Sequence, residues 1–259
     1  MSRDGWERIG RYIVDSRPRL VTGTASVGIL SRKGLTSPLE ITDQELAAAG
    51  YTRIDELQQR TAEGYAEEPL NEGPPQFLVP LEPGKVVGVG LNYRSHAIEV
   101  GAVIPKNPLL FAKFNTSPVG RGAANCLNRA VAQAEDWDVE LAVVVGRTPH
   151  CASRNEVQSA IFRYTVANDA TVRDIQVADI QWTPPKCSNT FGPSGPWLVP
   201  ASAIDASKAR LRARVDGVLM QDGTISDMIF DVTQLLSFCS WDFALHPAAR
   251  RCGSDGYTT

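Results

Sequence analysis

The stretch "EDWDVELAVVVGR", residues 135–147, begins with acidic residues and ends as a valine-rich apolar run. Such a run favours a buried β-strand. Alternate residues of a strand share a face, so Asp136, Asp138 and Glu140 are predicted to point the same way. Like charges side by side on one strand face repel each other. Carboxylates placed where the chain enters a core therefore call for a compensating partner.

Further strands are predicted on either side of this stretch. "KVVGVGLNY" (85–93) and "RYTVAND" (163–169) are apolar or alternating runs typical of strands. In "ARLRARVDGVLMQDG" (209–223), Asp216-Gly217 separates two such runs and predicts a β-hairpin. "DVTQLLSFCSWDF" (231–243) is typical of a helix that Asp231 would cap. The expected core is rich in β-structure, with few helices.

The length and composition are those of a soluble globular protein of 259 residues and 28.1 kDa. The net charge is −3 and no basic run stands out, so a nucleic-acid partner is not expected. No apolar run approaches the roughly 20 residues that cross a bilayer, and the N-terminus lacks a secretory h-region. Five cysteines without a CxxC pair predict reduced thiols and a cytoplasmic protein.

Two domains are expected. Residues 1–78 would form a small N-terminal domain with an amphipathic helix within 53–65, and Gly- and Pro-containing residues 71–77 would link it to the rest. Residues 79–259 would form the larger, β-rich domain, for an overall α+β class that is mainly β.

Three carboxylates coincide with predicted strand ends: Asp138, Glu140 and Asp169. If the strands lie side by side, these side chains form an oxygen cage of the kind that Mg²⁺ or Mn²⁺ occupies. Such a cation would also offset the repulsion between the carboxylates. The alternative is that Asp138 and Glu140 lie on a solvated face and that Asp169 caps a turn through Asn168-Asp169.

In "GLNYRSHAIEVG" (90–101), His96 and Glu99 are three residues apart, so a short helix would place both on one face. A carboxylate so placed can orient an imidazole that acts as a base. The alternative is a partly buried structural histidine. "GVGLNY" is not GxGxxG, because Tyr93 holds the last position, so a dinucleotide site is rejected.

A third cluster is the Gly- and Pro-rich loop "QWTPPKCSNTFGPSGPWLVP" (181–200). Lys186 within it could meet an anion or be a solvated surface lysine. Cys187 has no nearby histidine to activate a thiol. The chain contains no GxSxG, which argues against an ordinary serine hydrolase.

Six ordered blocks of this sequence resemble the fumarylacetoacetate hydrolase family over about two thirds of the chain, from Pro80 to Pro247. The blocks are "GLNYRSHAIEVG", "PLLFAKFNTSPVG", "DWDVELAVVVGR", "YTVANDATVRDIQ", "KCSNTFGPSGPWLV" and "DGTISDMIFDVTQLLSF". The resemblance implies a mixed β-sandwich roll behind a small N-terminal domain, and a homodimer.

The resemblance also assigns roles to residues. It implies that Mg²⁺, Mn²⁺ or Ca²⁺ is held by Asp138, Glu140 and Asp169, although the first position is commonly Glu in the family. The implied catalytic residues are His96, Glu99 and Lys186, and the implied substrate-binding residues are Tyr93, Arg94 and Gln176. Arg173 and Asp174 match the family as well, and a structural ion pair is the expected use of that couple.

The implied activity is cleavage of a C–C bond in a 2-oxo acid of the acylpyruvate or fumarylacetoacetate type, with His96 activating water. Related chemistries of the family remain open, namely decarboxylation of oxo-diacids and isomerisation in aromatic catabolism. After "LHP" this chain reads "AARRCGSDGYTT" where the family continues with a threonine loop and closing strands. A shifted reading frame or a decaying gene would explain that departure. It predicts a C-terminally truncated domain, and as a further alternative a catalytically impaired protein that only binds or oligomerises.

Overall fold

The computed structural model describes residues 78–130 and 132–247, and nearer the N-terminus the backbone of four strands. These strands form two antiparallel pairs, β1 (Arg8–Val14) with β2 (Arg17–Gly23) and β3 (Ile29–Arg32) with β4 (Tyr65–Glu68). The helix predicted within 53–65 falls mostly outside the described residues, as do the linker at 71–77 and the segment after Pro247. Tyr65 belongs to strand β4 and not to a helix, because its backbone pairs with Arg32.

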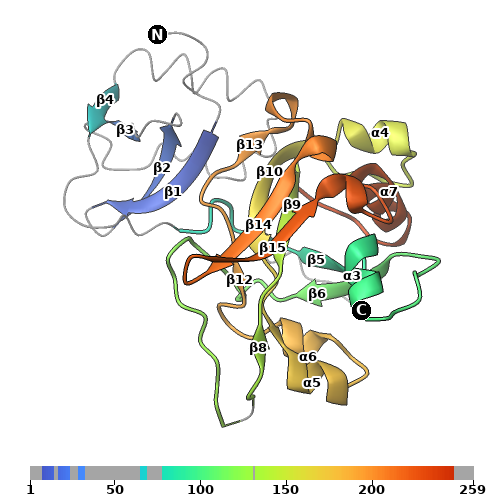
Figure 1. Ribbon diagram of the computed structural model, residues 1–259. Coiled ribbons are helices and arrows are strands. Elements are labelled where there is room, and N and C mark those ends of the chain that lie inside the picture. The colour runs from blue at the N-terminus through green and yellow to red at the C-terminus, as the bar shows by residue number, and fades with distance from the viewer. Residues whose placement is uncertain are drawn as a thin grey trace, which may run out of the picture.

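Short β-strands dominate the described part of the chain and pair in both directions (Figure 1). The central sheet is antiparallel in the order β13–β10–β9, with bounds β9 (Val139–Val145), β10 (Ile161–Asn168) and β13 (Val199–Pro200). Three further antiparallel pairs are β5 (Val86–Gly90) with β6 (Leu109–Lys113), β8 (Glu135–Asp136) with β11 (Thr171–Val172), and β14 (Arg210–Val215) with β15 (Val218–Thr224). A parallel pair joins β7 (Pro118–Val119) to β12 (Gly192–Pro193). The mainly β class is therefore confirmed.

The helices are short and lie at the ends of the strand assembly (Figure 1). They are α3 (Arg94–Glu99), α4 (Arg154–Gln158), α5 (Arg173–Ala178), α6 (Thr183–Lys186) and α7 (Val232–Asp242), with 3₁₀ turns at Ala201–Ala203, Ala206–Lys208 and Ile225–Asp227. Helices α4 and α7 pack against each other, and α5 packs against α6 near β8. None of the described helices combines the length and the apolar character that a bilayer crossing requires.

Local sequence signals account for several of these elements. Asp231 caps α7 as predicted, because its carboxylate accepts a hydrogen bond from the amide of Gln234 at 2.9 Å. The predicted hairpin is β14–β15, and Asp216 and Gly217 turn the chain with φ of 49° and 82°. Positive φ at both positions is what a two-residue hairpin turn of type I′ requires.

The main core lies between the central sheet and helices α4 and α7. It is built from apolar residues of these elements and of the segment between them: Val145, Ala152, Val157, Ala160, Ile161, Tyr164 and Leu236. Burial of this face orients β9 and β10, whose antiparallel register pairs Glu140 with Ala167 and Val139 with Asn168. The acidic start of β9 is thereby placed beside the end of β10, where Asp169 follows.

One expectation about the opening stretch is wrong in part. The strand is not continuous from Asp136, since β8 ends there and β9 begins only at Val139. The carboxylate of Asp136 accepts a hydrogen bond from the Trp137 amide at 2.8 Å, and the Asp138 amide donates to the Asn168 side chain at 3.2 Å. These side-chain bonds replace ladder hydrogen bonds and interrupt the strand.

Candidate active site

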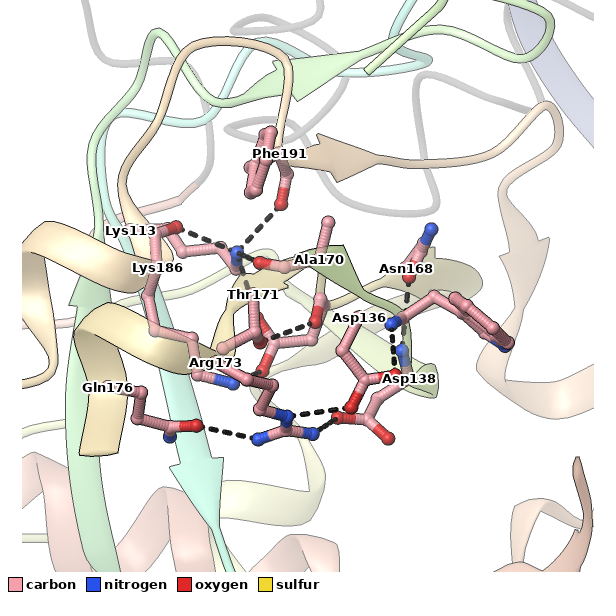
Figure 2. Close-up of polar contacts among 12 residues, drawn as sticks. Lys113, Asp136, Asp138, Asn168, Ala170, Thr171, Arg173, Gln176, Lys186 and Phe191 are labelled. Atoms are coloured by element: carbon pink, nitrogen blue, oxygen red, sulfur yellow. Dashed lines mark hydrogen bonds and ion pairs between the residues drawn. The ribbon is translucent and has the colours of Figure 1, made fainter. Parts of the chain in front are cut away.

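Arg173, the first residue of α5, bridges two acids of the opening stretch. Its Nε lies 2.7 Å from Asp136 Oδ2, and one terminal nitrogen lies 2.8 Å from Asp138 Oδ2. The other terminal nitrogen donates to Gln176 Oε1 at 2.7 Å. Figure 2 shows the guanidinium between the two carboxylates. The chain therefore supplies part of the positive charge that the acidic stretch calls for.

The second carboxylate oxygen of Asp138, Oδ1, also accepts a hydrogen bond. Gln221 Nε2, from strand β15, donates to Asp138 Oδ1 at 2.9 Å. Burial raises the pKa of the Asp138 carboxyl above its ordinary value, although Arg173 opposes the rise.

Asp169 lies between two buried lysines. Its Oδ1 is 2.8 Å from Lys113 Nζ, and its Oδ2 accepts a hydrogen bond from Lys186 Nζ at 2.5 Å. The side chains of Lys113 and Lys186 are only 7% and 5% exposed, so these ion pairs are shielded from water. The alternative in which Asp169 only caps a turn and Lys186 is a solvated surface lysine is therefore wrong.

Lys113 connects this carboxylate to three backbone carbonyls. Its ammonium donates to Ala170 O at 3.0 Å, Lys186 O at 2.8 Å and Phe191 O at 2.7 Å (Figure 2). Burial lowers the pKa of the Lys113 ammonium, and the Asp169 carboxylate opposes that effect. Lys113 thus connects the end of helix α6 at Lys186 to Ala170, which follows β10.

Glu140 is the acid of this cluster without a direct cationic contact, because no hydrogen bond or ion pair joins its carboxylate to any residue within the described ranges. Burial, followed by the charges of Asp169 and Asp138, raises the pKa of Glu140 to about 8. The charge of Lys186 still acts on this carboxylate and opposes the rise of its pKa in part. The hydroxyl of Tyr93 is buried and has no hydrogen-bond partner among the described residues. Burial and then the nearby charge of Glu140 raise the pKa of that hydroxyl, so Tyr93 belongs to the surroundings of Glu140.

The donor atoms of this cluster are of the kind that binds a hard divalent cation. Glu140, Asp138 and Asp169 supply carboxylate oxygens, the ligands that Mg²⁺ and Mn²⁺ prefer. The charges of Asp169 and Asp138 each raise the pKa of Glu140, so the three carboxylates share one electrostatic environment. As they stand, no group of three His, Cys, Asp or Glu side chains within 78–130 and 132–247 is gathered tightly enough to hold a metal ion. Two of the three carboxylates are instead turned toward Arg173 and the lysines.

His96 and Glu99 share one face of helix α3, as their spacing predicts. His96 Nδ1 lies 3.6 Å from Glu99 Oε2, and the two side chains are 38% and 79% exposed. Helix α3 begins directly after Tyr93, so its first turn starts beside the Glu140 cluster. The histidine–carboxylate pair is therefore accessible to solvent and follows a residue of the acidic site.

Arg94, Gln176 and Asp174 are the remaining residues that the sequence places in or near the site. Arg94 is exposed, and one of its terminal nitrogens lies 3.5 Å from Met228 O. Gln176 binds Arg173 through its carbonyl oxygen. The predicted ion pair between Arg173 and Asp174 is wrong, because adjacent residues at a helix start point in different directions. Asp174 instead accepts hydrogen bonds from backbone amides of the preceding segment, Gln133 at 3.0 Å and Ala134 at 3.4 Å.

The sequence prediction missed three residues of this site: Lys113, Asp136 as a partner of Arg173, and Gln221. A charged residue inside the apolar run "LLFAKF" was a usable sign that Lys113 has a buried partner. The alternation of the strand predicts that Asp136 shares a face with Asp138, but it does not show that Arg173 is its partner. Gln221 carried no sign, since a glutamine in a hairpin strand is ordinary.

The sequence of this chain matches a known protein family and two related proteins. Residues 85–248 match the family described as "Fumarylacetoacetate (FAA) hydrolase C-terminal". An uncharacterized protein of Archaeoglobus fulgidus is 39% identical over 165 residues, which is 64% of this chain and 65% of that protein. The chain thus spans slightly less than two thirds of this relative's length. The 2,4-didehydro-3-deoxy-L-rhamnonate hydrolase of a Sphingomonas strain is 36% identical over 87% of this chain and 78% of its own.

Solved structures agree with this match. The fumarylacetoacetate hydrolase of Exiguobacterium antarcticum superposes with a TM-score of 0.77 at 26% identity, over 93% of this chain and 83% of that one. The 5-carboxymethyl-2-hydroxymuconate delta-isomerase of Mycobacterium smegmatis gives 0.70 at 26% identity, over 93% of this chain and 84% of that one. A protein named as a hydrolase and one named as an isomerase therefore share the fold of this chain and are equally similar to it in sequence, at 26%.

Proposed function

Because this chain belongs to the fumarylacetoacetate hydrolase family, we propose that it is a divalent-metal-dependent hydrolase that cleaves a C–C bond in a 2-oxo acid of the acylpyruvate type. The observation that carries the proposal is Glu140, a buried carboxylate that no hydrogen bond or ion pair joins to a described residue, and whose pKa burial and the charges of Asp169 and Asp138 raise to about 8. Such a cluster favours the binding of a small, hard cation. We assign the ion to Glu140, Asp138 and Asp169, with Mg²⁺ or Mn²⁺ preferred and Ca²⁺ as an alternative.

The substrate class follows from the relative and from the donors. The Sphingomonas relative is named for a 2,4-didehydro-3-deoxy sugar acid, a name that denotes oxo groups at carbons 2 and 4. When bound, a divalent cation supplies positive charge to the 1-carboxylate and 2-oxo oxygens of such an acid and lowers the energy of the enolate. Tyr93 contributes a buried hydroxyl beside this position, and Arg94 and Gln176 are proposed to contact the substrate.

The protein's own residues carry the proton transfer. Glu99 faces Nδ1 of His96, which leaves Nε2 to take a proton from water. The resulting hydroxide equivalent adds to the carbonyl at carbon 4, and the bond between carbons 3 and 4 breaks. Carbon 3 keeps the electron pair and receives a proton, so the products are pyruvate and a carboxylic acid. Lys186 stays buried against Asp169 and holds that carboxylate in place.

A thermal melt with Mn²⁺ and oxalate, a mimic of the pyruvate enolate, tests the site. A ligand that binds only the folded state stabilises it by about 2.7 kcal/mol at 100 times its Kd. We expect a clear rise in melting temperature that needs both components. A protein that melts cooperatively and shows no shift would rule out the metal site, and the alternative of a non-catalytic family member would then take its place.

Exchanging Asp138 for asparagine tests the ligand assignment. We expect Asp138→Asn to weaken Mn²⁺ binding about tenfold or more. The affinity is measured from the concentration of free Mn²⁺, which electron paramagnetic resonance reports. The control is Asp216→Asn, which removes the same charge from the exposed hairpin turn, where asparagine tolerates positive φ. Equal Mn²⁺ affinity in both variants would remove Asp138 from the site.

Isomerisation is the second candidate, because the M. smegmatis isomerase is as similar in sequence as the hydrolase, at 26%. Analysis of the reaction products separates the three reactions. Hydrolysis yields pyruvate, decarboxylation yields CO₂, and isomerisation yields a product with the same molecular formula as the substrate.

We further propose that the strand pairs form the family's mixed β-sandwich roll, preceded by a separate domain over 1–78, and that two copies associate as a homodimer.

A further inference from the structure

Gln221 makes two hydrogen bonds of opposite polarity at the start of β9. Its Nε2 donates to Asp138 Oδ1 at 2.9 Å, while its Oε1 accepts from the Val139 amide at 2.8 Å. Both bonds are partly buried, and they connect two segments more than 80 positions apart in the chain. These two hydrogen bonds therefore connect the β14–β15 hairpin to Val139, the first residue of β9, and to the carboxylate of Asp138.

An irregularity in the hairpin aims Gln221 inward. Ala213 pairs with Gln221, yet the next residue, Arg214, pairs with Leu219, so Met220 is an extra residue on β15. A bulge of this kind shifts the alternation of side chains and redirects the following one. Leu219 and Met220 are both exposed, at 42% and 54%, whereas Gln221 is half-buried.

An amide suits this position chemically. The backbone N–H of Val139 needs an acceptor and the carboxylate of Asp138 needs a donor, and a glutamine side chain supplies one of each. Arg173 already binds the other oxygen of Asp138. With Gln221 in place, the two oxygens are held separately, so the carboxylate has one defined orientation.

We propose that Gln221 is a positioning residue, through which the β14–β15 hairpin sets the orientation of Asp138 for the metal site. This inference rests on the proposed function, in which Asp138 is one of the ligands. Without Gln221, Asp138 retains Arg173 as its side-chain partner, and its carboxylate can rotate about that contact. Residues that orient metal ligands in this way contribute about 10- to 100-fold to metal affinity.

The experiment compares two variants of the same strand in the full chain. Gln221→Met keeps the length of the side chain and removes both hydrogen bonds. Asp222→Asn is the matched control, because the next residue anchors the same hairpin by accepting from Arg210 at 2.7 Å and from Arg212 at 3.2 Å. We expect Mn²⁺ affinity to fall at least tenfold in Gln221→Met and to stay within twofold of the wild type in Asp222→Asn.

A double-mutant cycle in EDTA tests the contact without metal. The cycle combines Gln221→Met with Asp138→Ala, and urea unfolding is expected to show coupling between the two sites. Additive effects in EDTA, or Mn²⁺ affinity in Gln221→Met equal to that of the wild type, would overturn the role of Gln221. If the cycle shows coupling but the wild-type protein binds no Mn²⁺, the proposed function would be overturned instead. The role of Gln221 in positioning a metal ligand would then be overturned with it.

Discussion

Replacing Asp169 with asparagine is expected to lower the free energy of unfolding by about 3–5 kcal/mol, the usual cost of removing one partner of a buried ion pair. The carboxylate is the counter-charge of two ammonium groups, Lys113 and Lys186, whose side chains are at most 7% exposed. An asparagine can accept a hydrogen bond from one lysine but cannot balance either charge. Urea unfolding in EDTA measures the effect apart from any bound cation.

The control for this loss of stability is a solvent-exposed ion pair of the same protein. Asp205 lies 2.8 Å from Lys208, and the two side chains are 51% and 83% exposed. Asp205→Asn is expected to lower the free energy of unfolding only slightly, because exposed ion pairs contribute little. A loss of similar size in Asp169→Asn would mean that the buried lysines do not depend on the carboxylate.

Replacing His96 with alanine is expected to reduce kcat by about 10²- to 10⁴-fold on an acylpyruvate substrate, the usual contribution of a general base. The histidine side chain is 38% exposed, so the free energy of unfolding should change by no more than about 0.5 kcal/mol. Mn²⁺ affinity should not change, because His96 is not among the proposed ligands. Steady-state kinetics at saturating Mn²⁺ and a melt of each protein separate these effects.

His246 provides the matched control for this variant. It is exposed and contacts Thr148 through Nδ1 at 3.3 Å, on the segment after α7. His246→Ala is expected to keep the kcat of the wild type. Should His96→Ala keep it as well, water activation would have to be assigned to another residue, and the hydrolytic mechanism would lose its base.

Local sequence patterns were sufficient to predict much of the fold. The valine run of β9, the Asp216-Gly217 turn and the Asp231 cap all lie where the sequence placed them. The facing of His96 and Glu99 was also predictable, because residues three apart on a helix are neighbours whatever surrounds them. Each of these features depends on interactions within a few residues or on one repeating period.

Ordered short motifs carry the mainly β class and the family, so both could be predicted from the sequence. The pairing of cations with acids became visible only in the folded chain: Arg173 reaches Asp136 and Asp138 rather than its neighbour Asp174, and Asp169 lies between Lys113 and Lys186. The tertiary structure also brought Gln221 to Asp138 from a hairpin far along the chain. These partners meet only when the core between the sheet and its helices has formed, and contacts between residues so far apart in the chain leave no repeating pattern in the sequence.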